Sequence, residues 1–245
     1  ARNPSLAESM VGLGSPLWKA LPKSRNSKFG NLFRQLEKFS EGMKLPADER
    51  YWNWASFYPS GNARKLLKLN VEEKEYLERK RQLLQSISAT DFNSALYTDQ
   101  QMVLTNDMLT KVDSMSMANS LEVRVPFLDH EAVSFVNQLP VEFKINRQFK
   151  KRILQDTFRK TLPAELYNRP KHGFEVPLLK WFRTELKDLI EKDLLAKGFV
   201  EAQGIFDFAE IKSLLRQLYS NNPGDSATQI WNLVVFQTWW KNYLR

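Results

Sequence analysis

Basic side chains in a proline-containing segment are the first residues in this sequence that could carry chemistry. Residues 168–177 contain Arg169, Lys171 and His172 together with two prolines, and Gly173 lies between the prolines as a point where the backbone can hinge. A restrained loop with cationic tips suits an anionic ligand such as a phosphate chain. Basic surface loops without a ligand are also common, so the residues alone leave both interpretations open.

Lys151 is the second candidate. The spacing predicts a helix over residues 148–160 with an apolar stripe facing inward, and Lys151 lies three residues before Leu154 and seven before Phe158. The lysine therefore flanks the stripe. Either its aliphatic stem covers apolar surface while the ammonium reaches water, or the ammonium is placed to contact a phosphate. The spacing does not choose between the two.

An acidic and a basic residue, Glu122 and Arg124, lie on a link that we expect to be extended. The preceding helix should end near Ser120, and Pro126 disfavours helical backbone at the residue before it. Charges on a link pinned between two buried helices must pair with each other or face a cleft. A structural ion pair that braces the junction is one interpretation, and a pair turned toward a cleft is the other.

The helices that must position these groups dominate the sequence. Asp129 is predicted to cap a helix over residues 130–139, which Pro140 ends. Asp207 is predicted to begin another helix, and Asn70 a third. The last segment, residues 227–244, is apolar almost all round and should be deeply packed. The aromatic residues of segment 51–58 form either core or a stacking platform.

These patterns predict a predominantly α-helical chain and few strands. We expect a single helical lobe over residues 1–245. Within it, residues 1–98 form an N-terminal helical part, residues 99–190 a core that bears the site, and residues 191–245 the C-terminal helices.

Composition restricts the classes of function. The 245 residues are 42% hydrophobic, carry a formal net charge of +8 and include no cysteine and two histidines. Disulfides, thiolate zinc sites and a cysteine nucleophile are therefore excluded, and we expect no metal site. The positive charge is dispersed, which argues against nucleic-acid binding. No apolar run of about eighteen residues and no export signal is present, so we expect a cytoplasmic protein without membrane contact.

Several motifs in register resemble the synthetase half of the glutamine-dependent asparagine synthetases. Residues 107–129 read D-M-L-T-K-V-D-S-M-S-M-A-N-S-L-E-V-R-V-P-F-L-D. Downstream, K-R-I-L starts at Lys151, L-P at Leu162 and N-R-P-K-H-G-F at Asn168. The likeness is dense from about residue 99 to residue 181. It implies the helical C-terminal lobe of an ATP-pyrophosphatase-type α/β synthetase domain whose nucleotide-binding sheet is mostly missing from this chain.

The resemblance also implies an activity and roles for particular residues. Members of this family use ATP and Mg²⁺ to activate aspartate as aspartyl-AMP, which ammonia from glutamine then converts to asparagine. On that model Lys171 is the catalytic residue that meets the phosphates in the transition state, and Lys151 is a second contact to the phosphates of ATP. The resemblance assigns structural support of the site to Asp113, Glu122, Arg124, Asp129 and Arg169.

Two family motifs have no counterpart in this sequence. The Gly-rich S-G-G-x-D-S loop that cradles pyrophosphate is absent, as is the S-G-x-G-x-D-E segment. We therefore expect a fragment whose partners are the N-terminal glutaminase and nucleotide-binding parts, with aspartate and ATP as substrates and a homodimer as a possible assembly. We expect the isolated chain to be inactive. The alternatives are another amide-forming ligase of the superfamily, acting on a peptide, sugar or β-lactam, or a non-catalytic basic helical binding module.

Overall fold

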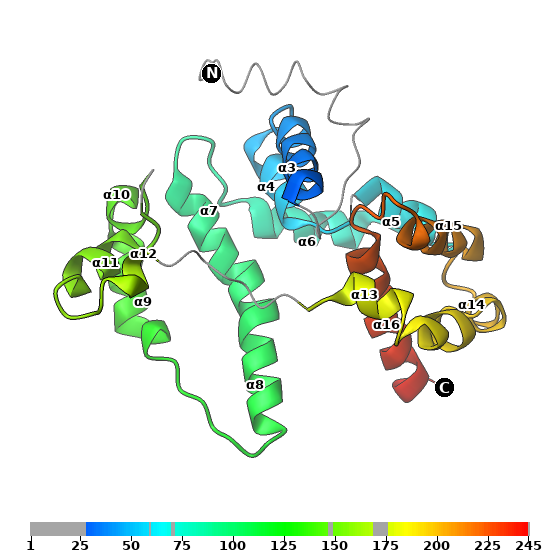
Figure 1. Cartoon of the computed structure of the whole chain (residues 1–245). Coiled ribbons are helices and arrows are strands. Elements are labelled where there is room, and N and C mark those ends of the chain that lie inside the picture. Colours follow the sequence, from blue (N-terminus) through cyan, green and yellow to red (C-terminus); the bar gives the residue numbers. More distant parts are fainter. Residues whose placement is uncertain (1–27, 59, 70–71, 147–148, 169–175, 245) are drawn as a thin grey trace. The chain divides into compact units, whose positions relative to one another are not determined.

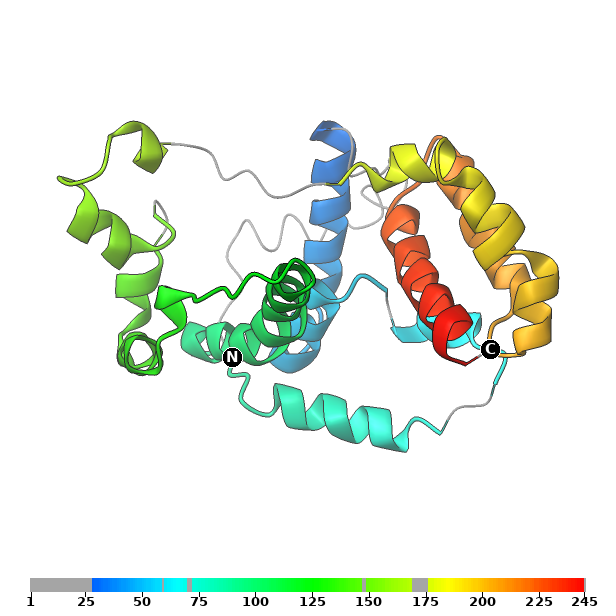
Figure 2. The same cartoon turned by 90° about the horizontal axis from the view of Figure 1, so that it is seen from below.

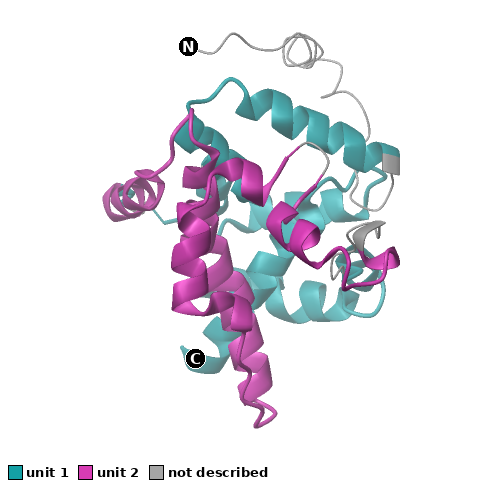
Figure 3. Ribbon diagram, turned by 90° about the vertical axis from the view of Figure 1, so that its left-hand side faces the viewer, with its two compact units in different colours: residues 1–73, 175–245 teal, residues 74–174 magenta. Residues whose placement is uncertain are grey.

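The computed structural model describes residues 28–58, 60–69, 72–146, 149–168 and 176–244. These residues form helices and two isolated β-bridges but no β-strand, which confirms the prediction of a predominantly helical chain. The chain divides into two compact units, one made of Ala1–Glu73 and Glu175–Arg245 and the other of Lys74–Phe174 (Figure 3). The boundaries expected at residues 98/99 and 190/191 stay predictions. No helix in the described ranges has the length and apolar content needed to cross a membrane.

The first unit joins described residues from before Lys74 and from after Phe174 around one apolar core. Its long last helix lies beside several shorter ones (Figures 1 and 2). Fully buried side chains from four of these helices, Phe182, Ile190, Ile211 and Ile230, form the centre of the core. The helices are α3 (Lys28–Gly42), α4 (Ala47–Ala55), α5 (Ser60–Leu66), α13 (Leu178–Arg183), the π-helix η3 (Leu189–Leu194), α14 (Lys197–Gln203), α15 (Phe208–Tyr219) and α16 (Ser226–Tyr243).

Helix α15 begins and ends as its sequence requires. The carboxylate of Asp207 accepts a hydrogen bond of 2.7 Å from the backbone N–H of Ala209, which confirms the predicted cap. At the other end, the Arg183 guanidinium donates to the carbonyls of Leu218, at 2.8 and 2.6 Å, and of Ser220, at 2.6 Å. A cation at the carbonyl end of a helix satisfies unpaired acceptors and complements the helix dipole. Arg183 therefore fastens α13 to the end of α15.

Helix α16 is buried on one side only. Ile230, Leu233 and Val234 are buried, whereas Trp231 and Val235 are 42% and 50% exposed. The prediction that this segment is deeply packed all round is therefore wrong for its second face. The helices α13, η3 and α15 contact α16, and these contacts leave Trp231 and Val235 exposed.

The hairpin of α3 and α4 is joined by ring stacking and by hydrogen bonds to backbone carbonyls. The rings of Phe39 and Trp54 stack with their centroids 5.7 Å apart, and Trp54 Nε1 donates to the carbonyl of Lys38 at 3.1 Å. Trp54 and Phe57 are nevertheless 41% and 50% exposed, so a core interpretation of the aromatic segment does not hold for these two residues. The Trp54 side chain instead braces α4 against α3.

Replacing Gly42 with alanine should destabilise this hairpin. A Cβ atom at residue 42 would lie 2.2 Å from Trp54 Nε1 and 2.7 Å from Trp54 Cε2, so the indole would have to leave its place between the helices. Overpacking of this kind costs about 1–3 kcal/mol in the free energy of unfolding, measurable by urea titration. Gly198→Ala is the matched control, because nothing lies within 4 Å of its Cβ position. An equal effect of both changes would contradict the prediction.

A short backbone contact fixes the end of α5 against the start of α15. Leu67 and Phe206 form an antiparallel bridge, with Lys68 N–H donating to the Ile205 carbonyl at 2.8 Å and Asp207 N–H to the Leu66 carbonyl at 2.9 Å. The bridge joins residues almost 140 positions apart in the sequence. It is one of the contacts that make a single unit from the two ends of the chain.

The second unit is built on one continuous helical rod that runs from Phe92 to Met117. Its middle third is π-helical, a geometry that is rare and is found mostly as short bulges at functional sites. The elements of this unit are α6 (Lys74–Leu84), α7 (Phe92–Asp99), the π-helix η1 (Gln100–Leu109), α8 (Thr110–Met117), the 3₁₀ turn η2 (Pro126–Leu128), α9 (His130–Gln138), α10 (Val141–Lys144), α11 (Arg152–Phe158) and α12 (Glu165–Asn168).

Two helix starts in this unit differ from the predictions. The helix expected to follow Asn70 directly begins at Lys74, and Asn70 itself lies outside the described residues. The helix expected over residues 148–160 is limited to Arg152–Phe158. A bridge between Ile145 and Lys150 takes up the residues before it, so a local turn overrides the helical periodicity there.

Candidate functional site

The basic loop lies largely outside the described residues. Arg169, Lys171 and His172 are not among them, so their predicted roles and the predicted mobility of residues 168–177 stay predictions. The chain is described again from Val176, and α13 begins directly after Pro177. The amphipathic helix expected after the loop is therefore present, although its α-helical part ends at Arg183.

Lys151 is the candidate residue that the structure describes in most detail. It is the residue just before α11 and has a left-handed backbone, with φ 60° and ψ 42°. The side chain is exposed. The expected helical position beside a buried stripe is wrong, because Lys151 precedes the helix and Phe158 is 45% exposed. An exposed ammonium is compatible with both interpretations, so the contact to a phosphate stays a prediction.

A small hairpin positions Lys151. The backbone N–H of Asn146 donates to the Phe149 carbonyl at 2.9 Å, and the Phe149 N–H donates to Asn146 Oδ1 at 2.7 Å. The Arg152 guanidinium then donates to the Glu142 carbonyl at 3.0 Å, which ties the first residue of α11 back to α10. Lys151 therefore lies between two residues, Phe149 and Arg152, that hydrogen bonds hold in place.

The ion pair of Glu122 and Arg124, within the motif at residues 107–129, is exposed. Arg124 and Glu122 pair directly, but their side chains are 88% and 68% exposed. The prediction that Glu122 and Arg124 pair is confirmed. The prediction that their link is pinned between buried helices is wrong, because both side chains are exposed to solvent. An ion pair in water contributes about 0–1 kcal/mol, so this pair does little to brace the junction. Asp113 is also exposed, in the first turn of α8.

Asp129 caps α9, as its place before the helix predicted. Its carboxylate accepts hydrogen bonds from the backbone N–H groups of Glu131, at 3.0 Å, and Ala132, at 3.2 Å. These bonds satisfy donors that the first turn of α9 would otherwise leave unpaired. The cap therefore sets where α9 starts relative to the motif before it.

Asp129→Ala should lower the free energy of unfolding by about 1 kcal/mol, the usual effect of losing an N-cap. Asp129→Asn is the matched control, because its side-chain oxygen can accept the same two bonds and it should lose only a few tenths of a kcal/mol. Both values follow from chemical denaturation. A loss as large for asparagine as for alanine would show that the charge and not the cap is what matters.

Helix α9 is held against the helical rod by polar contacts. Lys144 donates to Asn93 Oδ1 at 2.8 Å and to the Asn137 carbonyl at 3.3 Å, and Asn137 and Gln100 exchange side-chain hydrogen bonds of 3.2 and 3.0 Å. Burial lowers the pKa of the Lys144 ammonium, and the nearby charge of Asp91 acts in the opposite direction. These contacts place α10, and with it the hairpin before Lys151, on the rod that contains the motif.

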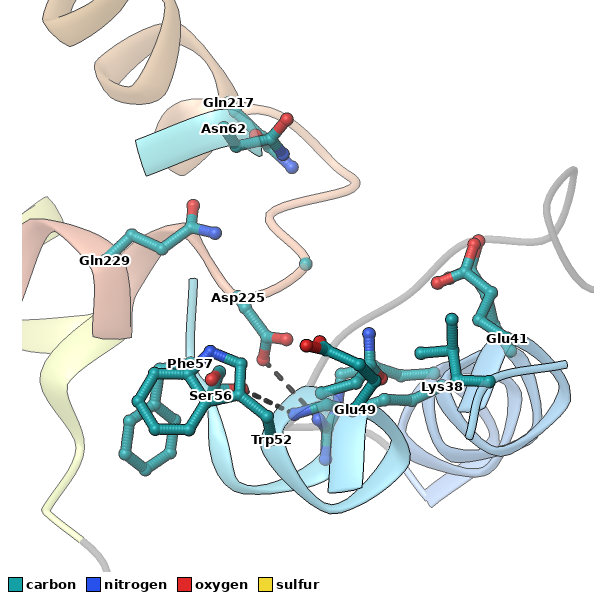
Figure 4. A pocket seen from close by; sticks show the side chains of 15 residues that line it. Lys38, Glu41, Glu49, Trp52, Ser56, Phe57, Asn62, Gln217, Asp225 and Gln229 are labelled. Carbon is teal, nitrogen blue, oxygen red and sulfur yellow. Dashed lines mark hydrogen bonds and ion pairs between the residues drawn. The ribbon is translucent and has the colours of Figure 1, made fainter. Parts of the chain in front are cut away.

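A separate cavity of about 330 Å³ lies in the first unit (Figure 4). None of the predicted site residues lines it. Side chains from α3 and α4 form one side, and Gln217 of α15 and Gln229 of α16 also face it. Four carboxylates line the cavity, those of Glu37, Glu41, Glu49 and Asp225.

Two cations of the cavity wall are engaged in holding the fold. Arg34 lies 3.6 Å from the Asp225 carboxylate, and Lys38 donates to the carbonyls of Trp54, at 3.2 Å, and Ser56, at 2.7 Å. Lys38 thus caps the carbonyl end of α4. The cavity was missed at the sequence level. The spacing of Glu37 and Glu41, one helical turn apart on α3, was the signal that could have indicated it. In the described ranges, no three His, Asp or Glu side chains are grouped so that they could hold a metal ion.

Comparison with known proteins identifies the family. A model of the family described as asparagine synthase matches residues 9–241. The chain is 29% identical over 195 residues to asparagine synthetase [glutamine-hydrolyzing] 1 of Bacillus subtilis, which covers 79% of this chain and 30% of that protein. It is 35% identical over 136 residues to a putative asparagine synthetase [glutamine-hydrolyzing] of Mycobacterium tuberculosis strain H37Rv, covering 56% and 20% of the two chains.

A mammalian relative gives a similar result. Asparagine synthetase [glutamine-hydrolyzing] of Rattus norvegicus is 32% identical over 135 residues, which is 49% of this chain and 24% of that protein. The chain thus spans less than a third of the length of these relatives. No solved structure gave a significant match. Because the family model covers nearly the whole chain, with the motif stretch and the Lys151 segment inside the matched residues, this protein belongs to the asparagine synthase family.

Proposed function

We propose that this chain is the helical part of an asparagine synthetase-type ligase. In the proposed reaction, the aspartate carboxylate attacks the α-phosphate of ATP to give aspartyl-AMP and release pyrophosphate. Ammonia from glutamine then attacks the acyl carbon, and AMP leaves as asparagine forms. The observation that carries the proposal is the family match over residues 9–241, together with the uninterrupted motif at residues 107–129.

The residues of this chain have two proposed tasks in that reaction. Adenylation moves negative charge onto pyrophosphate, and fixed cations lower the barrier by stabilising that charge. Lys171 is the proposed catalytic cation, and Lys151 the second contact to the phosphates. The side chain of Lys151 is exposed, so its ammonium is accessible to a ligand. Asp129 supports the site by capping α9, and Asp113, Glu122, Arg124 and Arg169 are its other proposed supports.

Magnesium ion would supply charge neutralisation on the phosphates. The described residues do not offer a grouped set of acidic ligands for it, so no residue of this chain is assigned to the ion. The glutaminase and nucleotide-binding parts that the reaction also requires are proposed partners within the longer protein.

Aspartate-dependent exchange of labelled pyrophosphate into ATP tests the proposal. The full-length protein should catalyse the exchange, and asparagine should form when glutamine or ammonium is added. The 245-residue polypeptide alone should show neither activity, because the Gly-rich phosphate loop is not in its sequence. Exchange that depends on a different carboxylic acid would instead indicate another amide-forming ligase.

A further inference from the structure

Helix α16, drawn in red in Figures 1 and 2, has an apolar side that faces solvent. Trp231, Val235, Trp239 and Tyr243 recur every four residues, so they lie along one side of the helix over about 18 Å. Trp239 is 46% and Tyr243 73% exposed, and the other two are exposed to a similar extent as Trp239. We call these four residues the aromatic stripe. Exposed apolar surface that is gathered in one place marks a site of association.

The exposed side of α16 carries no charge. Lys241 is the one charged residue of Ser226–Tyr243, and its ammonium lies 2.7 Å from both oxygens of the Asp193 carboxylate. The exposed residues of the helix outside the aromatic stripe are uncharged, namely Asn232, Thr238 and Asn242. Charged residues make up 26% of the whole sequence, so a solvent-facing helix side without any is unusual. Depletion of charge together with enrichment of Trp and Tyr is the composition of an interface core.

The exposed area of this side is large enough for a specific contact. With about 150–250 Å² for a whole aromatic side chain, the aromatic stripe and the neighbouring Leu244 expose on the order of 500 Å². Two such faces packed together would bury about 1,000 Å² of accessible surface, which is the lower limit of a specific protein–protein interface. An interface at this limit is expected to be a weak one, which forms and dissociates with concentration.

A second copy of the chain is the partner that such a face fits. In a twofold contact each residue meets the same residue, or a near neighbour of it, in the other copy, so a charge on the face would meet a like charge. The exposed side of α16 avoids this repulsion, although the chain carries a net charge of +8. An acidic partner of different sequence would be recognised by cations on this side of the helix, and its exposed residues include none.

We propose that the exposed side of α16 is a homodimer interface, in which two copies of the helix pack antiparallel about a twofold axis. Val235 is the residue nearest the axis, because it lies midway between Trp231 and Trp239, and each Trp231 packs against Trp239 of the other copy. The interface does not depend on the proposed ligase chemistry. Because the contact is weak, the chain is monomeric in dilute solution, where Val235 is exposed and contributes little to the stability of the single chain.

Sedimentation equilibrium of the full-length protein tests the interface. The wild type should pass from monomer to dimer between about 1 and about 100 μM, the range of a weak interface. Val235→Glu and Val235→Lys should each raise the dissociation constant at least about tenfold, because each places two like charges beside the axis. In an equimolar mixture of the two variants the charges are opposite, so the dissociation constant should be at least about fivefold lower than that of either variant alone. Ser213→Glu, at an exposed residue of α15, is the control and should leave the dissociation constant unchanged.

Three outcomes would overturn the inference. The first is a wild-type protein that stays monomeric up to about 100 μM. The second is a Val235→Glu dimer as tight as that of the wild type. The third is that both charged variants of residue 235 lower the melting temperature of the dilute monomer by more than about 5 °C and that mixing them restores no association. Another part of the same polypeptide would then cover the exposed side of α16.

Discussion

Lys171→Ala in the full-length protein should lower asparagine formation by at least about a hundredfold, the effect of removing one group that stabilises transition-state charge. The loss should appear in kcat more than in the KM for ATP, because the proposed contact strengthens as charge moves onto pyrophosphate. The melting temperature should stay within about 1 °C of the wild type, since the sequence predicts that Lys171 lies in a loop, where a basic side chain contributes little to packing. Steady-state kinetics and a thermal scan measure both quantities.

Lys180→Ala is the control for this prediction. Lys180 is the first lysine after the loop, it lies on α13, and its side chain is exposed. The Lys180→Ala substitution also removes one positive charge but leaves the proposed contact of Lys171 with the phosphates in place, so turnover should change less than twofold. Equal turnover of the Lys171→Ala variant and the wild type would remove Lys171 from the mechanism. A large decrease in the melting temperature of the Lys171→Ala variant would show that Lys171 stabilises the fold and does not act in the chemistry.

Ile230→Ala should give the largest loss of stability among the substitutions considered. Ile230 is fully buried on α16 and belongs to the same core cluster as Phe182 and Ile211. Truncation removes three buried carbons and leaves a cavity, which costs about 2–5 kcal/mol in the free energy of unfolding. Urea unfolding followed by tryptophan fluorescence measures the loss, and the chain contains seven tryptophans.

Val235→Ala on the same helix is the matched control. Val235 is 50% exposed, so its truncation removes much less buried surface and should cost less than about 1 kcal/mol. The comparison tests whether α16 is buried on one face only. Similar losses at residues 230 and 235 would mean that the second face of α16 is covered as well.

The sequence predicted best those features that depend on a few neighbouring residues. Asp129 and Asp207 cap the helices that were expected to follow them, because an N-cap needs only a short side chain and the next two or three N–H groups. The helical class of the chain follows from periodicity in the same way. The pairing of Glu122 with Arg124 was also predictable from a separation of two residues on an extended link.

Features that depend on packing were predicted poorly. The apolar composition of α16 indicated burial on all sides, but composition carries no information on how many neighbouring helices are available to cover it. The bridge between Ile145 and Lys150 interrupts a segment whose spacing is helical, because bonds between Asn146 and Phe149 compete locally with the first helical turns. The cavity in the first unit combines residues 34–62 with residues 217–229, and no local pattern predicts that Glu49 and Gln229 line the same cavity.

The discontinuous make-up of the first unit has a consequence for biosynthesis. Residues before Lys74 share that unit with residues after Phe174, and contacts such as Arg34 with Asp225 join positions nearly 200 apart. On a ribosome that adds about 5–20 residues per second, the early helices therefore wait on the order of ten seconds or more for their partners. During that interval the intervening segment can fold first, while chaperones have the exposed apolar faces of the nascent N-terminal helices as a binding target.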